Sequence, residues 1–378
     1  MCRSLTHLTC NTTFAAEGIL LSPEGTLVHH SEINHNMRFI RLGLHSPSLR
    51  HAMLLLVRCP ELSYFSTSCV NDIDARMVLS ACPKLAFFEC QILAKRYRQW
   101  LQHEHNDLES PSHSSSVVQQ QQQPSSSSTC LRELTLEPIS FEQQVLDLHH
   151  PFLQRLELGV INGEEEITRT LLRNTPMLEE LHLCFYDLVD YIPAAIRSLS
   201  NLRSLHLSLL RTREQHEGLI SLFQGFHRLP SHLAVGINCN LYQQSSPEVV
   251  ANILMSLAGI HQLKYLNLHS HQDIDDNHLI TFFEHVTQHV ETVIFAFPSM
   301  SSSLLSVMAN RLHHLELFEI AFCGNISRDG LRTLVDTKAR TSPGKLLLKI
   351  RLSYMDDGTK ASDINVRIGQ DDFPLIQQ

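Results

Sequence analysis

The apolar residues of this chain follow one short pattern, L-x-x-L-x-L, which recurs along most of its length. Six segments carry leucine in all three slots, and they begin at Leu131, Leu153, Leu178, Leu202, Leu263 and Leu312. The last two leucines of each motif are two residues apart, which is the spacing of side chains on one face of a β-strand. Each motif therefore predicts a short strand with two inward side chains.

Relaxed copies extend this pattern toward both ends of the chain. They are Leu5-Leu8-Cys10, Met37-Ile40-Leu42, Leu62-Phe65-Thr67, Leu85-Phe88-Cys90, Val290-Val293-Phe295 and Leu347-Ile350-Leu352. Successive motifs usually begin about 22 to 35 residues apart, a period typical of stacked repeat units. The segment with Leu233, Val235 and Ile237 also alternates like a strand, but its register is ambiguous.

Between the strand motifs the apolar period changes from two to about 3.6, which predicts helices. Apolar residues stand at i, i+3, i+4 and i+7 in the segments 192–199, 219–226, 250–257 and 279–286. Ser246 is a suitable N-cap for the third of these helices, and Pro247 follows at its first position. Each unit therefore reads as strand, turn and helix.

One such unit cannot bury its own apolar edge, so consecutive units must stack. Neighbouring strands lie about 4.8 Å apart, whereas packed helices need about 8 to 10 Å. The stack must therefore curve with its sheet on the inside. We expect an α/β fold: a horseshoe-shaped solenoid with a parallel sheet on the concave side and helices on the convex side.

Four longer segments resemble the leucine-rich repeats of F-box/LRR proteins, particularly fungal ones of the cysteine-containing, ribonuclease-inhibitor-like type. They are "LLVRCPELSYFS", "VLSACPKLAFFEC", "LLRNTPMLEELHL" and "AFCGNISRDGLRTLV", and the resemblance covers nearly the whole chain. It implies a leucine-rich-repeat solenoid that recruits a target protein for a ubiquitin ligase, while a separate F-box docks a Skp1-type adaptor. Because this chain enters a repeat at Leu5, we expect such an adaptor only if an F-box lies upstream.

Two segments depart from the repeat. Residues 104–129 are rich in serine and glutamine, and we expect a disordered loop that interrupts one solenoid spanning residues 1–355. Residues 356–378 are acidic and irregular, and we expect an edge strand followed by a tail.

Composition narrows the function classes. The formal net charge is −9 with a pI near 6.2, so the basic excess typical of nucleic-acid binding is missing. The chain contains neither an apolar run of the roughly 18 residues that a membrane helix needs nor an export signal. We expect a soluble protein of the cytoplasm or nucleus, with its 10 cysteines as thiols.

Side chains that alternate with the inward leucines should project from the concave face of the sheet and form the binding surface. The predicted partner-binding residues are Glu180, His182, His206, Tyr265, Asn267, His269, His314, Glu316 and Phe318. In this predicted register Tyr265 aligns with Ser204. Aromatic and apolar groups bordered by charges are suited to binding a protein, because aromatic anchors supply much of the energy of interfaces.

The 24 histidines raise the question of metal binding or catalysis. Pairs such as His269 and His271 stand without the further ligands of a zinc motif, so we expect no metal and no cofactor. Cys184 lies two residues from His182, and we expect it to face His206 on the next strand, an arrangement that can activate a thiol. Without a recognisable oxyanion hole or phosphate loop, we expect a recognition scaffold and no enzyme. A stand-alone inhibitor or scaffold, and an enzyme or activator using these His and Cys groups, remain the alternatives.

Overall fold

The chain folds into two compact units, each built from strand and helix repeats. The computed structural model describes residues 6–10, 35–42, 56–68, 75–91, 130–136, 149–160, 172–185, 192–209, 216–241, 246–270, 274–297, 299–321, 323, 325–341, 346–351, 353–354, 360–361 and 364–367. Unit 1 comprises residues 1–159 and 166–179, and unit 2 comprises residues 160–165 and 180–378. The predicted loop at 104–129 lies outside the described residues.

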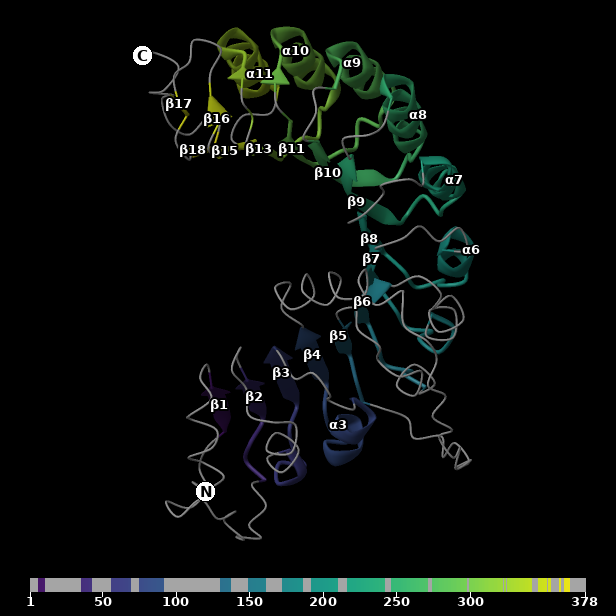
Figure 1. The fold of residues 1–378 in the computed structure, drawn as a ribbon. Coiled ribbons are helices and arrows are strands. Elements are labelled where there is room, and N and C mark those ends of the chain that lie inside the picture. Colours follow the sequence, from purple (N-terminus) through teal and green to yellow (C-terminus); the bar gives the residue numbers. More distant parts are fainter. Residues whose placement is uncertain are drawn as a thin grey trace, which may run out of the picture. The chain divides into compact units, whose positions relative to one another are not determined.

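Unit 1 contains parallel strands that pair in the order of the chain (Figure 1). They are β1 (His7–Cys10), β2 (Phe39–Leu42), β3 (Tyr64–Ser68), β4 (Phe87–Gln91), β5 (Glu133–Leu136) and β6 (Arg155–Val160). Helix α3 (Ala75–Ala81) connects β3 to β4. This order is the one that stacked repeat units produce.

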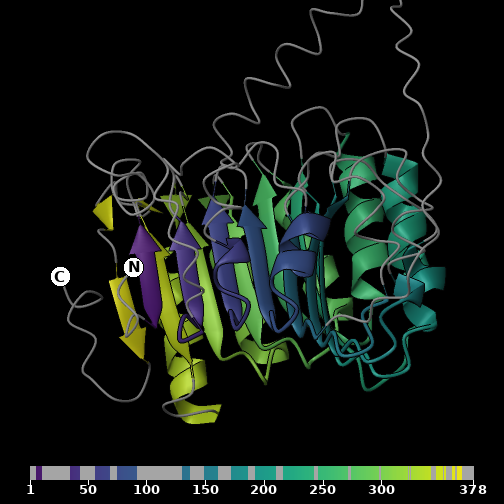
Figure 2. The same cartoon turned by 90° about the horizontal axis from the view of Figure 1, so that it is seen from below.

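Unit 2 continues the same architecture. Its parallel strands are β7 (Glu180–Phe185), β8 (Ser204–Leu209), β9 (Ala234–Leu241), β10 (Leu263–Ser270), β11 (Thr292–Ala296), β13 (Leu317–Ala321) and β15 (Leu347–Arg351). Strand β18 (Ile364–Arg367) pairs antiparallel with β15 at the sheet edge. Two short pairs flank the sheet, namely β12 (Ser299–Met300) with β14 (Asn325–Ile326), and β16 (Ser353–Tyr354) with β17 (Lys360–Ala361). Figure 2 shows the strands of the repeats lying side by side within each unit.

The helices of unit 2 form a layer against one face of its sheet (Figure 1). They are α6 (Ile192–Arg197), α7 (His216–Phe226), α8 (Pro247–Ala258), α9 (Asp276–His285), α10 (Ser302–Arg311) and α11 (Arg328–Thr341), and each contacts the next. We call the opposite face of the sheet, in either unit, the open face. None of the helices in the described ranges is long and apolar enough to cross a membrane.

The leucines of the repeat form the core, as their spacing predicts. In the five strict motifs that begin between Leu131 and Leu263, every leucine with a described side chain is at most 7% exposed. The predicted helix stripes are also inward, because Ile196, Leu222 and Phe283 are buried. The prediction of an α/β repeat fold with parallel strands and a helix layer is thereby confirmed.

Side-chain caps begin three consecutive helices. The hydroxyl of Ser246 accepts a hydrogen bond from the Val249 amide at 3.4 Å, and Pro247 opens helix α8 as predicted. Asp275 and Ser301 cap α9 and α10 in the same way. Such caps satisfy amide groups that the first turn of a helix leaves without an internal partner.

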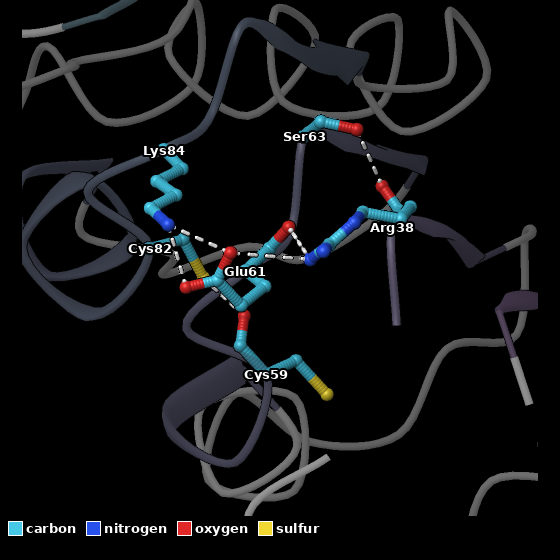
Figure 3. A network of polar contacts seen from close by, with 6 residues as sticks. All are labelled: Arg38, Cys59, Glu61, Ser63, Cys82 and Lys84. Carbon is cyan, nitrogen blue, oxygen red and sulfur yellow. Dashed lines mark hydrogen bonds and ion pairs between the residues drawn. The ribbon is translucent and has the colours of Figure 1, made fainter. Parts of the chain in front are cut away.

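The turns of unit 1 are joined by a polar network that runs across three repeats (Figure 3). The carboxylate of Glu61 lies 2.8 Å from the Lys84 ammonium and 3.4 Å from the Arg38 guanidinium. The hydrogen bond from Lys84 lowers the pKa of Glu61. Close to these ion pairs, the buried Cys82 thiol donates a hydrogen bond to the carbonyl oxygen of Cys59 at 3.8 Å. The network connects the turns that precede strands β2, β3 and β4.

One predicted register is wrong. The motif at Leu312 predicts that Leu315 and Leu317 fill the two inward positions of the strand, but Phe318 and Ile320 fill them in β13. Leu315 is also buried, ahead of the strand, whereas Leu317 is only half-buried on the other side. The reason is that Leu312 belongs to the end of helix α10, where it is the C-cap residue. The strand motif therefore begins at Leu315, and the two adjacent apolar residues Leu317 and Phe318 made both registers look acceptable.

A second register differs in the middle of unit 2. Strand β9 aligns His206 with Gly236, and Gly236 in turn with Tyr265. Tyr265 thus shares a row with His206, whereas the prediction aligned Tyr265 with Ser204. An irregularity in the pairing between Leu263 and Tyr265 accompanies the shift. The cause is the compressed motif of β9, in which Leu233, Val235 and Ile237 are all inward.

Candidate binding surface on the open face

Three predicted residues come together on the open face of unit 2. His182 and His206 are opposite each other on β7 and β8, with ring centroids 6.1 Å apart. The ring of His206 also meets that of Tyr265 at 5.8 Å, edge to face, although β9 lies between their strands. Gly236 of β9 allows this, because a β-carbon there would overlap the His206 ring. Because Gly236 has no side chain, the rings of His182, His206 and Tyr265 form one row.

A second row, two residues further along the strands, is polar. The hydroxyl of Ser208 lies 3.0 Å from Nε2 of His182, and Sγ of Cys184 lies 3.8 Å from the same nitrogen. Ser208 is buried, whereas His182 and Cys184 are half-buried. One imidazole nitrogen thus faces both a thiol and a hydroxyl.

The far end of this polar row carries a buried acid. Glu319 of β13 is 8% exposed, and its carboxylate lies 3.0 Å from Nε of Arg351 and 4.0 Å from Nζ of Lys349. Burial raises the pKa of Tyr265, and the charge of Glu319 adds to the shift, while a side-chain hydrogen bond with Asn267 opposes it. The surface therefore ends in an ion cluster that sequence reasoning missed, because the wrong register of β13 hid Glu319.

The other predicted residues divide into three groups. Glu180 precedes His182 on β7, and Asn267 and His269 follow Tyr265 on β10, each on the open face. His314 and Glu316 are exposed in the turn and the approach to β13. Phe318 is fully buried, so its prediction as a surface residue is wrong. It pairs with Val293 and fills the inward position that Leu315 was expected to fill.

Unit 1 carries an aromatic row that the sequence analysis missed. His7, Phe39, Tyr64 and Phe87 stand directly opposite one another on β1 to β4. The rings of Phe39 and Tyr64 are stacked with centroids 4.1 Å apart, and those of Tyr64 and Phe87 at 4.2 Å. His7 lies 5.4 Å from Phe39 at the end of the row. We call these four residues the aromatic row.

The aromatic row had a signal in the sequence. Each of its residues directly precedes the second apolar slot of a relaxed motif, as Tyr64 precedes Phe65. Because apolar residues then fill adjacent positions, alternation is lost and the outward ring looks like part of the core. All three larger rings are half-buried, because stacking on their neighbours covers their faces.

Thiols on the described strands and turns differ in their surroundings. Burial raises the pKa of Cys59 to about 11 and that of Cys82 and Cys239 to about 12. Cys130 is exposed, whereas Cys184 is half-buried beside His182. In the described part of the chain, no group of three or more His, Cys, Asp or Glu side chains is arranged to hold a metal ion.

Stacked strand and helix repeats with inward leucines define a leucine-rich-repeat fold. A scan against models of protein families and a search of curated proteins find no match. Among solved structures, the chain is similar to the leucine-rich repeat-containing protein LegL7 from Legionella pneumophila, with 13% sequence identity, 86% of each chain covered and a TM-score of 0.36. The assignment of the fold rests on the strands and helices of this chain, not on that likeness.

Proposed function

We propose that this chain is a protein-recognition scaffold that binds its partner through the open faces of its sheets. The aromatic row of unit 1 is the observation that carries the proposal. Aromatic side chains are enriched among the residues that dominate binding energy, and here they project from a rigid sheet. Rings already held by their neighbours lose little conformational freedom when a partner covers them.

The row of His182, His206 and Tyr265 supports a second contact region in unit 2. Polar groups flank it, including Ser208 and Asn267, and such groups supply the hydrogen bonds of an interface. A sheet face of this kind is the usual binding surface of solenoid proteins. We therefore infer that the chain acts by binding a partner and not by catalysis.

The resemblance to F-box/LRR proteins supports a finer proposal, in which the chain recruits a target for a ubiquitin ligase. In that case a Skp1-type adaptor would bind an F-box elsewhere in the same gene product. A stand-alone inhibitor or scaffold uses the same open face without the adaptor. Both versions of the proposal share one test.

The test is affinity capture with the full chain and two open-face variants. The first variant combines Phe39→Ala, Tyr64→Ala and Phe87→Ala, and the second combines His206→Ala with Tyr265→Ala. Met255→Ala is the matched control, because Met255 is a large exposed side chain on helix α8. We expect a protein captured by the wild type and the control to be lost from at least one open-face variant.

Equal capture by all four proteins, with unchanged folding by circular dichroism, would contradict the proposed function. If a Skp1-type adaptor is captured together with the partner by the full-length gene product, the ligase version holds. Capture of a partner without the adaptor supports the stand-alone scaffold.

A further inference from the structure

The contact between His182 and Cys184 has a geometry that protein–protein recognition does not require. Both residues belong to β7, two positions apart, so their side chains leave the same face of the strand. Nε2 of His182 and Sγ of Cys184 are 3.8 Å apart. A nitrogen and a sulfur donor thus converge on one point of the open face.

This separation is close to the distance between two donor atoms that bind the same metal ion. Zinc binds imidazole nitrogen at about 2.0 to 2.1 Å and thiolate sulfur at about 2.3 Å, so tetrahedral angles place the two donor atoms about 3.5 Å apart. The two side chains would need to approach by only a few tenths of an ångström. A side chain on a flat strand can make such an adjustment without moving the backbone.

The surroundings of the pair favour a bound ion. The hydroxyl of Ser208 lies 3.0 Å from Nε2 of His182, and the ring of His206 stands on the neighbouring strand. On binding, the ion replaces the Ser208 hydroxyl as the partner of Nε2, and the displaced hydroxyl and the His206 ring can then hydrogen-bond water molecules that complete the coordination of the ion. Because His182 and Cys184 are only half-buried, an ion can reach them from solvent.

The donor set selects the kind of ion. Thiolate and imidazole bind zinc and related transition metals, whereas calcium and magnesium prefer oxygen ligands. We propose that His182 and Cys184 chelate one zinc(II) ion on the open face of unit 2. The Cys184 thiol releases its proton to water as the sulfur–zinc bond forms, and the neutral imidazole of His182 donates its nitrogen lone pair.

Two protein ligands leave further coordination positions open. Water fills them in the free chain, and a His, Cys or carboxylate side chain of a bound protein can replace that water. This last step rests on the proposed function, because it needs a partner on the open face. The metal site itself does not, so the two proposals can fail separately.

The test uses cobalt(II) as a spectroscopic substitute for zinc(II) in the purified full chain. Binding of cobalt to a thiolate produces a charge-transfer absorption band in the near ultraviolet. We expect a band that saturates at one ion per chain and disappears on addition of one equivalent of zinc(II). Cys184→Ser should abolish this band, and His182→Gln should weaken cobalt binding at least tenfold.

Cys130→Ser is the matched control, because Cys130 is an exposed thiol on another part of the chain. It should leave the band and the affinity unchanged. A second measurement needs no variant: zinc(II) should slow alkylation of Cys184 by iodoacetamide at least tenfold, measured by peptide mass spectrometry. A thiolate–cobalt band that survives in Cys184→Ser, or alkylation of Cys184 that zinc(II) does not slow, would overturn the proposed site.

Discussion

Lys338 is a buried charged residue, and its position is unfavourable for the folded chain. Its side chain is completely buried in helix α11, and its ammonium donates a hydrogen bond to the carbonyl oxygen of Leu312. That carbonyl belongs to the C-cap residue of helix α10, so the lysine joins the two helices. Desolvation by burial lowers the pKa of Lys338 to about 8. The hydrogen bond to Leu312 thus requires that the charge of Lys338 be removed from water, which is unfavourable.

The stability of the chain should therefore depend on Lys338 in alkaline solution. Between pH 8 and 10.5 the unfolded chain binds this proton and the folded chain does not, so the free energy of unfolding rises with pH. The full effect amounts to about 3 kcal/mol. Below pH 8 both states are protonated, and the destabilisation is complete and constant.

Lys338→Met tests this linkage by urea denaturation at pH 7, 8, 9 and 10. We expect the variant to be about 1 to 2 kcal/mol more stable at pH 7, because the gain from removing the buried charge exceeds the lost hydrogen bond. Its stability should also rise less between pH 8 and 10 than that of the wild type. Lys264→Met is the control, because Lys264 is exposed and paired with Glu291. An unchanged pH profile in Lys338→Met would contradict the prediction.

Leu205 and His206 test which way the residues of β8 face. Leu205 is fully buried and His206 is exposed. Leu205→Asp should place an unpaired carboxylate between the sheet and the helices and cost several kcal/mol, read as a fall in melting temperature. His206→Ala should change the stability by less than about 0.5 kcal/mol. Similar losses for both variants would mean that the assigned facing is wrong.

At the scale of elements, helix α11 carries a glycine where it packs against helix α10. A β-carbon at Gly330 would lie 2.7 Å from Cα of Ser302 and 2.8 Å from Cδ1 of Leu305. The first of these atoms belongs to the backbone, so it cannot move away without moving the helix. Gly330 therefore sets the distance between these two helices.

Gly330→Ala should destabilise the chain although alanine is the better helix former. The gain in helix propensity is at most about 1 kcal/mol, whereas forced overpacking costs about 1 to 3 kcal/mol. We expect a net loss of about 1 kcal/mol in urea denaturation. Gly236→Ala is the comparison, because the atoms it would meet belong to the exposed ring of His206, which can rotate away. A larger loss for Gly236→Ala than for Gly330→Ala would contradict this explanation.

Most elements could be predicted from the sequence, but not all of their registers. The motif at Leu202 leaves one acceptable register, since the residues between its leucines are polar or small. Around Leu312, Leu315 and Leu317 only a short turn separates the end of helix α10 from β13, so apolar residues satisfy two registers at once. Packing against α10 decides between them, and packing is not visible in a local pattern.

At the scale of the whole molecule, the two units should lose structure separately. Repeats contact mainly their neighbours, so the effect of a core substitution decays along the array. Leu205→Asp should increase amide hydrogen exchange in β7 to β9 and leave β1 to β3 unchanged, as measured by mass spectrometry. Phe65→Asp, at another fully buried position, should do the reverse and affect β2 to β4.

Equal acceleration of exchange in both units by either substitution would mean that the chain unfolds as one body. The two units would then differ only in how densely their residues pack, and neither would unfold independently of the other. Wild-type exchange at the same pH gives the reference for both variants.

The candidate site was only partly predictable from the sequence. Alternation identified His182 and His206 as neighbours, because both follow an unambiguous leucine motif. It could not bring Tyr265 beside them, since that contact depends on the compressed motif of β9 and on the missing side chain of Gly236. The aromatic row was missed for a different reason: outward rings adjacent to inward ones resemble a continuous core.

The sequence by itself determined the repeat, the strand and helix order, and the identity of most inward leucines. These follow from periodicity, which is a local property that burial of one face imposes on each unit. The tertiary structure alone decided the registers of β9 and β13, the meeting of His206 with Tyr265 and the burial of Lys338. They depend on how one unit packs against the next, and residues distant in the chain contribute to that packing as much as neighbours do.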